Sequence, residues 1–204
     1  MGTETNVLPY FNQPAPDIVP MVHLEAGHKA ALMRHFLALT PRDRYLRFGY
    51  AISDEQMENY VNQIDFDQDE IFGIFNHKLE LIAVAHIGVS RMPKDTREAE
   101  FGVSVVPNAQ GKGFGYRLFQ RAVLFARNHG IQRLTLQCLS ENGPMIHIVR
   151  KARMTVQSNH GETMASLKIP PSNLPSVLEE WMQSASARAD LAIKKMTYRA
   201  AAPG

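Results

Sequence analysis

Two glutamates and a glycine-rich loop lie close together in the sequence and are the residues best suited to chemistry. Glu98 and Glu100 stand two residues apart in the segment EAEFGVSVV, and the loop PNAQGKGFG follows at residues 107–115. If the segment is a strand, both carboxylates lie on the same face. A carboxylate there can accept a proton from a reacting group, beside a loop whose glycines let the backbone approach a ligand.

The loop is followed by a helical pattern, YRLFQRAVLFARNHG. The first turn of a helix carries unpaired N–H groups and the positive end of the helix dipole. We therefore predict that residues 111–116 hold an anionic phosphate. A tight strand-to-helix turn would also use glycine, but three glycines at alternating positions, with Lys112 between two of them, favour an anion site.

Two familiar phosphate loops fit this stretch poorly. A Walker loop needs GxxxxGK[ST], whereas Lys112 is followed by another glycine. A dinucleotide loop needs GxGxxG, whereas position 116 is Tyr and the segments upstream predict a hairpin instead of βαβ units. A protein that binds NAD or ATP is therefore a distant alternative.

The segment from Gln110 to Gly115 matches the Q/R-x-x-G-x-G/A signature of the GNAT superfamily of N-acetyltransferases. The stretch AEFGVSVVPNAQGKGFG resembles the family's fourth strand and loop, and NHGIQRLTLQCLSENGPMIHIVRKARM resembles its fifth strand and next helix. The GNAT domain of Pat-type protein lysine acetyltransferases is especially similar, because a segment like LTPRDRYLRF also occurs near its start. The resemblance covers about residues 17–170 and is strongest over 98–153.

This resemblance implies acetyl-CoA as cosubstrate, with no metal, and a primary amine as acceptor, either a protein lysine or a small molecule. It implies that Glu100 is the general base, with Glu98 as the second candidate if a β-bulge exchanges their roles. The backbone of residues 103–105 is expected to pair with the pantetheine arm. The expected cofactor-binding residues are Val103, Ser104, Val105, Gln110, Gly111, Lys112, Gly113, Phe114, Gly115, Tyr116 and Asn142.

The sequence departs from the family where many members carry a tyrosine that protonates the leaving thiolate. Val149 holds that place, and Arg153-Met154 replaces the usual Gly-Phe. Pat-type domains also lack the tyrosine, and a thiol with a pKa of about 8.5 can leave without it. Tyr116, Ser140 or Cys138 could substitute, so the general acid stays unassigned. The alternative function is a non-catalytic acyl-CoA-binding regulatory module.

Strand and helix patterns alternate along the chain and predict an α/β (α+β) fold, with a mostly antiparallel sheet of six or seven strands flanked by helices. Ser53 and Gln56 predict a capping box, and Asn142 predicts another helix cap. The strand candidates are residues 17–24, 70–76, 80–89, 98–106, 134–139 and 162–169. The helix candidates are residues 28–39, 53–64, 116–130, 143–152 and one or two helices beyond 171.

We expect three parts in the chain: an extended arm at 1–16, a GNAT domain at 17–170 and a C-terminal helical extension at 171–204. The extension carries more apolar residues than a tail needs, which predicts that it docks on the domain or pairs two subunits as a homodimer. The arm lacks the basic and apolar regions of a secretion signal.

Composition narrows the class of protein further. The net charge of +2 spreads over 22 basic and 20 acidic residues, which predicts neither a nucleic-acid nor a membrane-surface binder. The segment 44–48 mixes cations with aromatics, and we interpret it as part of a helix that lines the acceptor groove. Cys138 is the only cysteine, and His28 and His35 have no further ligand at metal spacing. We expect a cytoplasmic protein without a metal site.

Overall fold

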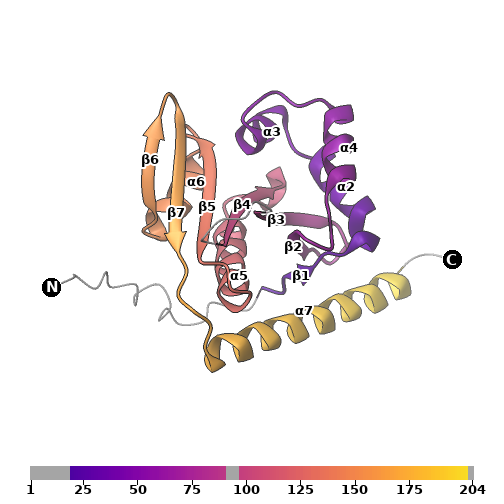
Figure 1. Ribbon diagram of the computed structural model, residues 1–204. Helices are drawn as coiled ribbons and strands as arrows, with labels where there is room; N and C mark the ends of the chain where they lie inside the picture. Colours follow the sequence, from indigo (N-terminus) through magenta and orange to yellow (C-terminus); the bar gives the residue numbers. More distant parts are fainter. Residues whose placement is uncertain (1–18, 91–96, 202–204) are drawn as a thin grey trace.

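The computed structural model describes residues 19–90 and 97–201, in which seven strands form one mixed sheet. The strands are β1 (Val22–His23), β2 (Glu70–Phe75), β3 (Leu81–Val89), β4 (Glu98–Val105), β5 (Arg133–Leu139), β6 (Thr155–Asn159) and β7 (Glu162–Lys168). Their order is β1-β2-β3-β4-β5-β7-β6, and each neighbouring pair is antiparallel except β4 with β5 (Figure 1). The predicted fold class is confirmed.

Six α-helices surround the sheet within the described residues. They are α2 (Lys29–Leu37), α3 (Pro41–Phe48), α4 (Asp54–Gln63), α5 (Phe114–Asn128), α6 (Gly143–Lys151) and α7 (Leu174–Ala201). Thr40 and Ser53 begin α3 and α4, and each side chain accepts a hydrogen bond from the third helical N–H. The predicted box of Ser53 and Gln56 is therefore confirmed, and Pro41 starts a separate helix.

Hydrophobic side chains fill two cores, one on each face of the sheet. On one face, Phe119 of α5 packs edge-on against Phe101 of β4, with ring centroids 5.2 Å apart. On the other face, Phe36 of α2 and Met57 of α4 are fully buried among side chains of β2 and β3. Both faces of the central strands are covered, which fixes their positions relative to the helices.

The sheet opens between β4 and β5. These strands pair over only three residues, from Glu98↔Arg133 to Glu100↔Thr135. Beyond this point β5 continues with β7, while β4 pairs with β3 as far as Val105. The second half of β4 therefore has one free backbone edge.

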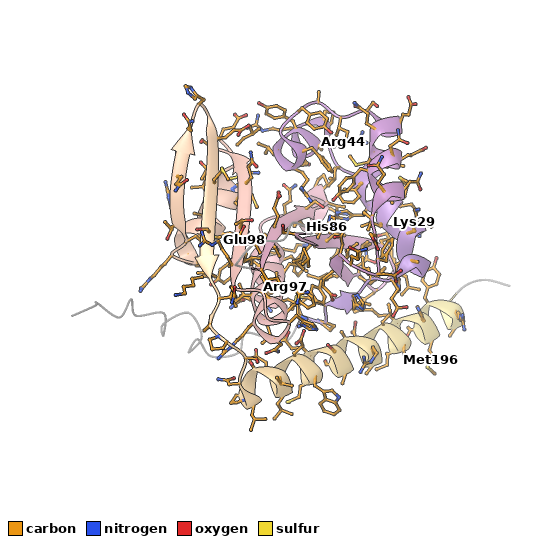
Figure 2. All side chains as sticks on the ribbon, viewed as in Figure 1. Lys29, Arg44, His86, Arg97, Glu98 and Met196 are labelled. Atoms are coloured by element: carbon orange, nitrogen blue, oxygen red, sulfur yellow. The ribbon has the colours of Figure 1, made fainter. Side chains whose placement is uncertain are left out.

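The C-terminal segment forms a single helix, α7, which runs below the sheet in Figure 1. Ala187 and Leu191 are buried in the core, and Glu180 accepts hydrogen bonds from Arg121 at 2.8 Å and Asn128 at 2.8 Å. The opposite side of α7 exposes apolar side chains, among them Met196, which points away from the sheet in Figure 2. The docking of this segment is confirmed, and pairing of two subunits stays a prediction. No helix in 19–90 or 97–201 combines the length and apolar character that a bilayer span requires.

The two outer strands β1 and β6 differ from the sequence prediction. The predicted first strand is reduced to Val22–His23. Strand β6 was not predicted, because TVQSN contains one apolar residue and all five positions are exposed. The expected arm at 1–16 lies outside the described residues.

Candidate active site

A cavity of about 890 Å³ opens beside the free edge of β4. Helix α3 and the start of α6 border it, together with the glycine loop and the first turn of α5. All of the cofactor-binding candidates expected from the sequence line this one cavity: Val103, Ser104, Val105, Gln110, Gly111, Lys112, Gly113, Phe114, Gly115, Tyr116 and Asn142. The glycine loop and the free edge of β4 therefore line the same cavity.

The free edge of β4 supplies backbone groups to the cavity wall. Val103, Ser104 and Val105 line it, while the same strand is hydrogen-bonded to β3 along its other edge. An open strand edge presents alternating N–H and C=O groups that can pair with an extended ligand. The pairing of β3 with β4 runs in unbroken register from Ala83↔Val105 to Val89↔Ala99, so no bulge along this edge exchanges the places of Glu98 and Glu100.

The glycines of the loop serve different purposes. Gly111 and Gly113 have φ of 74° and 77°, a left-handed conformation that favours glycine, and a Cβ on either would meet nothing within 4 Å. Gly113 is also the N-cap of α5, so the helix N–H groups face this open space. Gly115 lies inside α5, where a Cβ would come within 3.6 Å of Ile148. The loop therefore leaves open space at 111–113 in front of the first turn of α5.

Side chains around the loop anchor it and add positive charge. Gln110 donates to Asp43 of α3 at 2.9 Å and to the carbonyl of Val105 at 3.1 Å. Lys112 donates to the carbonyl of Asn108 at 3.1 Å, and Lys151 lies 3.9 Å above the ring of Tyr116. These lysines give the loop end of the cavity a positive field.

The two glutamates of β4 have different surroundings. Glu98 forms an ion pair with Arg133 of β5, with 3.3 Å between the side-chain atoms, and its side chain is mostly buried. Glu100 is exposed and makes no hydrogen bond or ion pair with any residue that the structure describes. Glu100 is therefore the more accessible of the two carboxylates, and neither of them lines the cavity.

Asn142 and Val149 show how α6 meets the cavity. Asn142 caps α6 by accepting from the N–H of Met145 at 3.2 Å, and it donates to the carbonyl of Leu46 in α3 at 3.0 Å. Its side chain therefore ties α3 to α6, and the predicted cap is confirmed. Val149, which stands where many GNAT members carry the tyrosine, is buried in the core and 2% exposed. Valine has no hydroxyl, so this position supplies no general acid.

A buried histidine that sequence reasoning did not connect to the site supports the cavity wall. His35 of α2 bonds the Leu81 carbonyl through Nδ1 at 2.8 Å and the Ser104 hydroxyl through Nε2 at 2.8 Å. The carbonyl can only accept, so Nδ1 carries the proton and Nε2 accepts from Ser104. Burial lowers the pKa of His35 to about 4, so the imidazole is neutral at neutral pH.

This histidine predicts a loss of stability in mild acid. Between pH 6.5 and about 4 the unfolded chain protonates His35 while the folded chain does not. Its contribution is therefore complete above pH 6.5 and falls as the pH falls toward 4, by on the order of 3 kcal/mol. Urea unfolding at pH 7 and pH 4.5 should show a larger loss for the wild type than for His35→Gln.

Glu70 titrates in the opposite direction, because burial raises its pKa to about 7. Its contribution is present below about pH 4.5 and is lost as the pH rises through 7. It is common to both proteins, so the difference between wild type and His35→Gln isolates His35. Equal losses in the two proteins would contradict the assignment.

A chain of polar side chains, Arg47, Tyr60 and His86, begins at the cavity wall. Arg47 of α3 lines the cavity and donates to the hydroxyl of Tyr60 at 3.4 Å. The hydroxyl of Tyr60 lies 2.8 Å from His86 Nδ1. His86 Nε2 lies 3.2 Å from a carboxylate oxygen of Asp69, but the geometry does not meet the criteria for a hydrogen bond. Figure 2 shows His86 on β3 near the centre of the molecule. The sequence predicted that the segment 44–48, which contains Arg47, lines the acceptor groove, but it assigned no role to Tyr60 or His86.

Comparison with known protein families identifies the family of this chain. Residues 35–153, more than half of the chain, match the family model described as the acetyltransferase (GNAT) family. The matched segment begins in α2 and ends just after α6, so it contains the cavity, the glycine loop and β4.

Solved structures share the fold. The GNAT domain of S. lividans PAT aligns with a TM-score of 0.63 and 19% identity, over 76% of this chain and 96% of that chain. A spermidine N-acetyltransferase from Vibrio cholerae, in complex with CoA and spermine, aligns with a TM-score of 0.57 and 19% identity, over 72% and 94%. RimL, a ribosomal-protein α-N-acetyltransferase in complex with CoA, aligns with a TM-score of 0.57 and 18% identity, over 75% and 98%.

Proposed function

This chain belongs to the acetyltransferase (GNAT) family, and on that premise we propose that it transfers the acetyl group of acetyl-CoA to a primary amine by direct attack in a ternary complex. The observation that carries the proposal is the cavity, in which the glycine loop meets the free edge of β4. Glu100 does not line the cavity but stands three residues before Val103 in the same strand. The proposed domain is 17–170, with α7 in the extension, in a cytoplasmic protein.

The cavity suits acetyl-CoA at both ends. Gly111 and Gly113 leave open space before the N–H groups of α5, where a pyrophosphate would lie. No strand pairs with the edge of residues 103–105 on this side, so it can pair with the pantetheine amides as a neighbouring strand would. When bound, acetyl-CoA supplies a thioester carbonyl, and a backbone N–H of β4 can donate to its oxygen.

Glu100 is proposed to remove the proton of the acceptor. An alkyl ammonium has a pKa of about 10.4, so at neutral pH the amine must lose a proton before it can attack. Glu100 accepts this proton directly or through water. The thiol leaves with a pKa of about 8.5, so the absence of a hydroxyl at Val149 does not prevent the reaction.

The acceptor class stays open at this stage. The name of one matched structure gives spermidine as its acceptor, and another acts on a ribosomal protein. At 18–19% identity both share the fold alone, so a protein lysine and a small amine are equally consistent with this chain.

The proposal predicts amine-dependent release of free CoA with intersecting initial-velocity lines when acetyl-CoA and amine are both varied. Polyamines, amino acids, aminoglycosides and lysine-containing proteins form the acceptor panel, and calorimetry measures acetyl-CoA binding separately. Parallel lines would contradict direct transfer, because they indicate a covalent acetyl-enzyme. Binding of acetyl-CoA without release for any amine would favour the acyl-CoA-binding regulatory module.

A further inference from the structure

The side chain of Arg47 lies directly on the backbone of β4. A Cβ built on Gly102 would overlap the guanidinium group of Arg47, so glycine at this position is what makes room for the cation. Gly102 pairs with His86 of β3 and stands two residues after Glu100. The guanidinium and the Glu100 carboxylate therefore occupy neighbouring places on one face of β4, with backbone positions about 7 Å apart.

Neighbouring side chains hold Arg47 in this place. Its guanidinium donates to the hydroxyl of Tyr60 at 3.4 Å and stacks on the ring of Phe48, with 5.1 Å to the ring centroid. Burial raises the pKa of Tyr60, so this hydroxyl keeps its proton and can donate to His86 Nδ1, 2.8 Å away. Arg47 is thereby oriented while most of its donors remain unused by the residues that the structure describes.

Arg47 and Glu100 do not neutralise each other. No ion pair within 4 Å joins them in the described part of the chain, and Glu100 makes no other such pair there. Arg47 lines the cavity, and Glu100 is exposed on the same face of β4 without being part of the cavity lining. Opposite charges on one strand face that do not pair with each other match a ligand that carries both charges. An ammonium beside Glu100 and a carboxylate beside Arg47 would satisfy both.

We propose that Arg47 binds the carboxylate of the acceptor, so that the acceptor is a small amino acid whose amine lies beside Glu100. This inference rests on the proposed acetyl transfer and names its acceptor class. A planar guanidinium binds a carboxylate through two parallel hydrogen bonds, which fixes the direction of the amine as well as the affinity. Arg47 is thus a specificity-determining residue.

The position of Arg47 argues against a role in holding the cofactor phosphates. Helix α3 runs along the cavity, and its first turn lies at the glycine loop, where Asp43 accepts from Gln110. Arg47 is in the last turn of α3 and lies over Gly102, which comes five residues before the loop begins at Pro107. Lys112 and Lys151 are already at the loop end of the cavity.

The test compares each amino acid with its own amide, which keeps the amine and removes the carboxylate. Glycine, β-alanine and γ-aminobutyrate are paired with their amides, with rates corrected for the ionisation of each amine, and spermidine and a lysine-containing protein complete the set. For the wild type we expect kcat/KM to favour the acid over the amide by about 10- to 100-fold for the best pair.

Substitutions at Arg47 should remove this preference. In Arg47→Met the ratio of kcat/KM for the acid to kcat/KM for its amide should fall to about 1. Arg47→Lys should keep part of the preference, because the positive charge remains while the planar guanidinium is lost. The KM for acetyl-CoA should change by less than about 3-fold in both. Tyr60→Phe should raise the KM for the amino acid and leave the amide unaffected. Each ratio is internal to one protein, so a partial loss of folding does not imitate the result.

A measurement on the wild type alone gives independent support. Short carboxylic acids without an amine, such as propionate and butyrate, should inhibit competitively against the acceptor and not against acetyl-CoA. Turnover with spermidine or protein lysine and no preference for acids would overturn this inference while the acetyltransferase function stands. A preference unchanged in Arg47→Met, or a matching rise in the KM for acetyl-CoA, would also overturn it. No turnover with any amine would overturn the proposed function and this inference together.

Discussion

Replacing Glu100 with Gln is expected to lower kcat by about 10²- to 10⁴-fold at neutral pH, because the acceptor amine then has no carboxylate to take its proton. The amide is nearly isosteric with the carboxylate, and Glu100 is exposed, so stability should be affected little. Free CoA release with the best acceptor measures the change. Part of the lost rate should return at higher pH, where more of the amine is already unprotonated.

Glu98→Gln is the matched comparison, since it makes the same chemical change two residues away on the same face of β4. Glu98 pairs with Arg133, so its loss should weaken the junction of β4 and β5 and reduce kcat less than the Glu100 variant does. A larger loss in Glu98→Gln, with acetyl-CoA affinity retained, would transfer the base role to Glu98. Equal activity of wild type and Glu100→Gln would remove Glu100 from the mechanism.

The backbone conformation of the glycine loop could be predicted because its signals are local. Gly111 and Gly113 adopt the positive φ that a loop of this kind needs, and the helix begins directly after them. The strand before the loop alternates, and the cap at Asn142 needs only a residue three positions away. Such features depend on neighbours in the chain, so a single sequence is sufficient to predict them.

The acceptor side could not be predicted in the same way, because it is assembled over long distances in sequence. Arg47, Tyr60 and His86 come from three separate elements and meet only when α3 and α4 pack on β3 and β4. Two local signals were present. The segment 44–48, which contains Arg47, mixes cations with aromatics, and we interpret it as part of a helix that lines the acceptor groove. Gly102 interrupts an otherwise well-formed strand, and a glycine inside a strand indicates that another group approaches the backbone closely.

Polar edge strands also carry little sequence signal. Strand β6 pairs with β7 from Thr155↔Ser166 to Asn159↔Glu162, but all its side chains are exposed. Without a buried face there is no alternation of apolar and polar residues to reveal it. Strand β1 is the opposite case, since its apolar residues led to a longer prediction than the structure has: the pairing of β1 with β2 covers only Val22↔Gly73 and His23↔Phe72.

Replacing Gly113 with Ala should weaken acetyl-CoA binding by about 10- to 100-fold while leaving the fold intact. The backbone at Gly113 has φ of 77°, which costs roughly 1–2 kcal/mol for a residue with a Cβ. The new methyl group would project into open space before the first turn of α5, where the pyrophosphate is proposed to lie. The KM for acetyl-CoA should therefore rise, and the KM for the acceptor should change little.

Gly130→Ala separates backbone strain from lost contact with the cofactor. Gly130 has φ of 70°, and a Cβ there also meets nothing within 4 Å, but it follows the C-terminal end of α5 and does not line the cavity. Both substitutions should lower the free energy of unfolding by similar amounts, and only Gly113→Ala should reduce acetyl-CoA affinity in calorimetry. If both variants bind acetyl-CoA equally well, the 111–113 turn does not hold the pyrophosphate, and its glycines serve only the entry into α5.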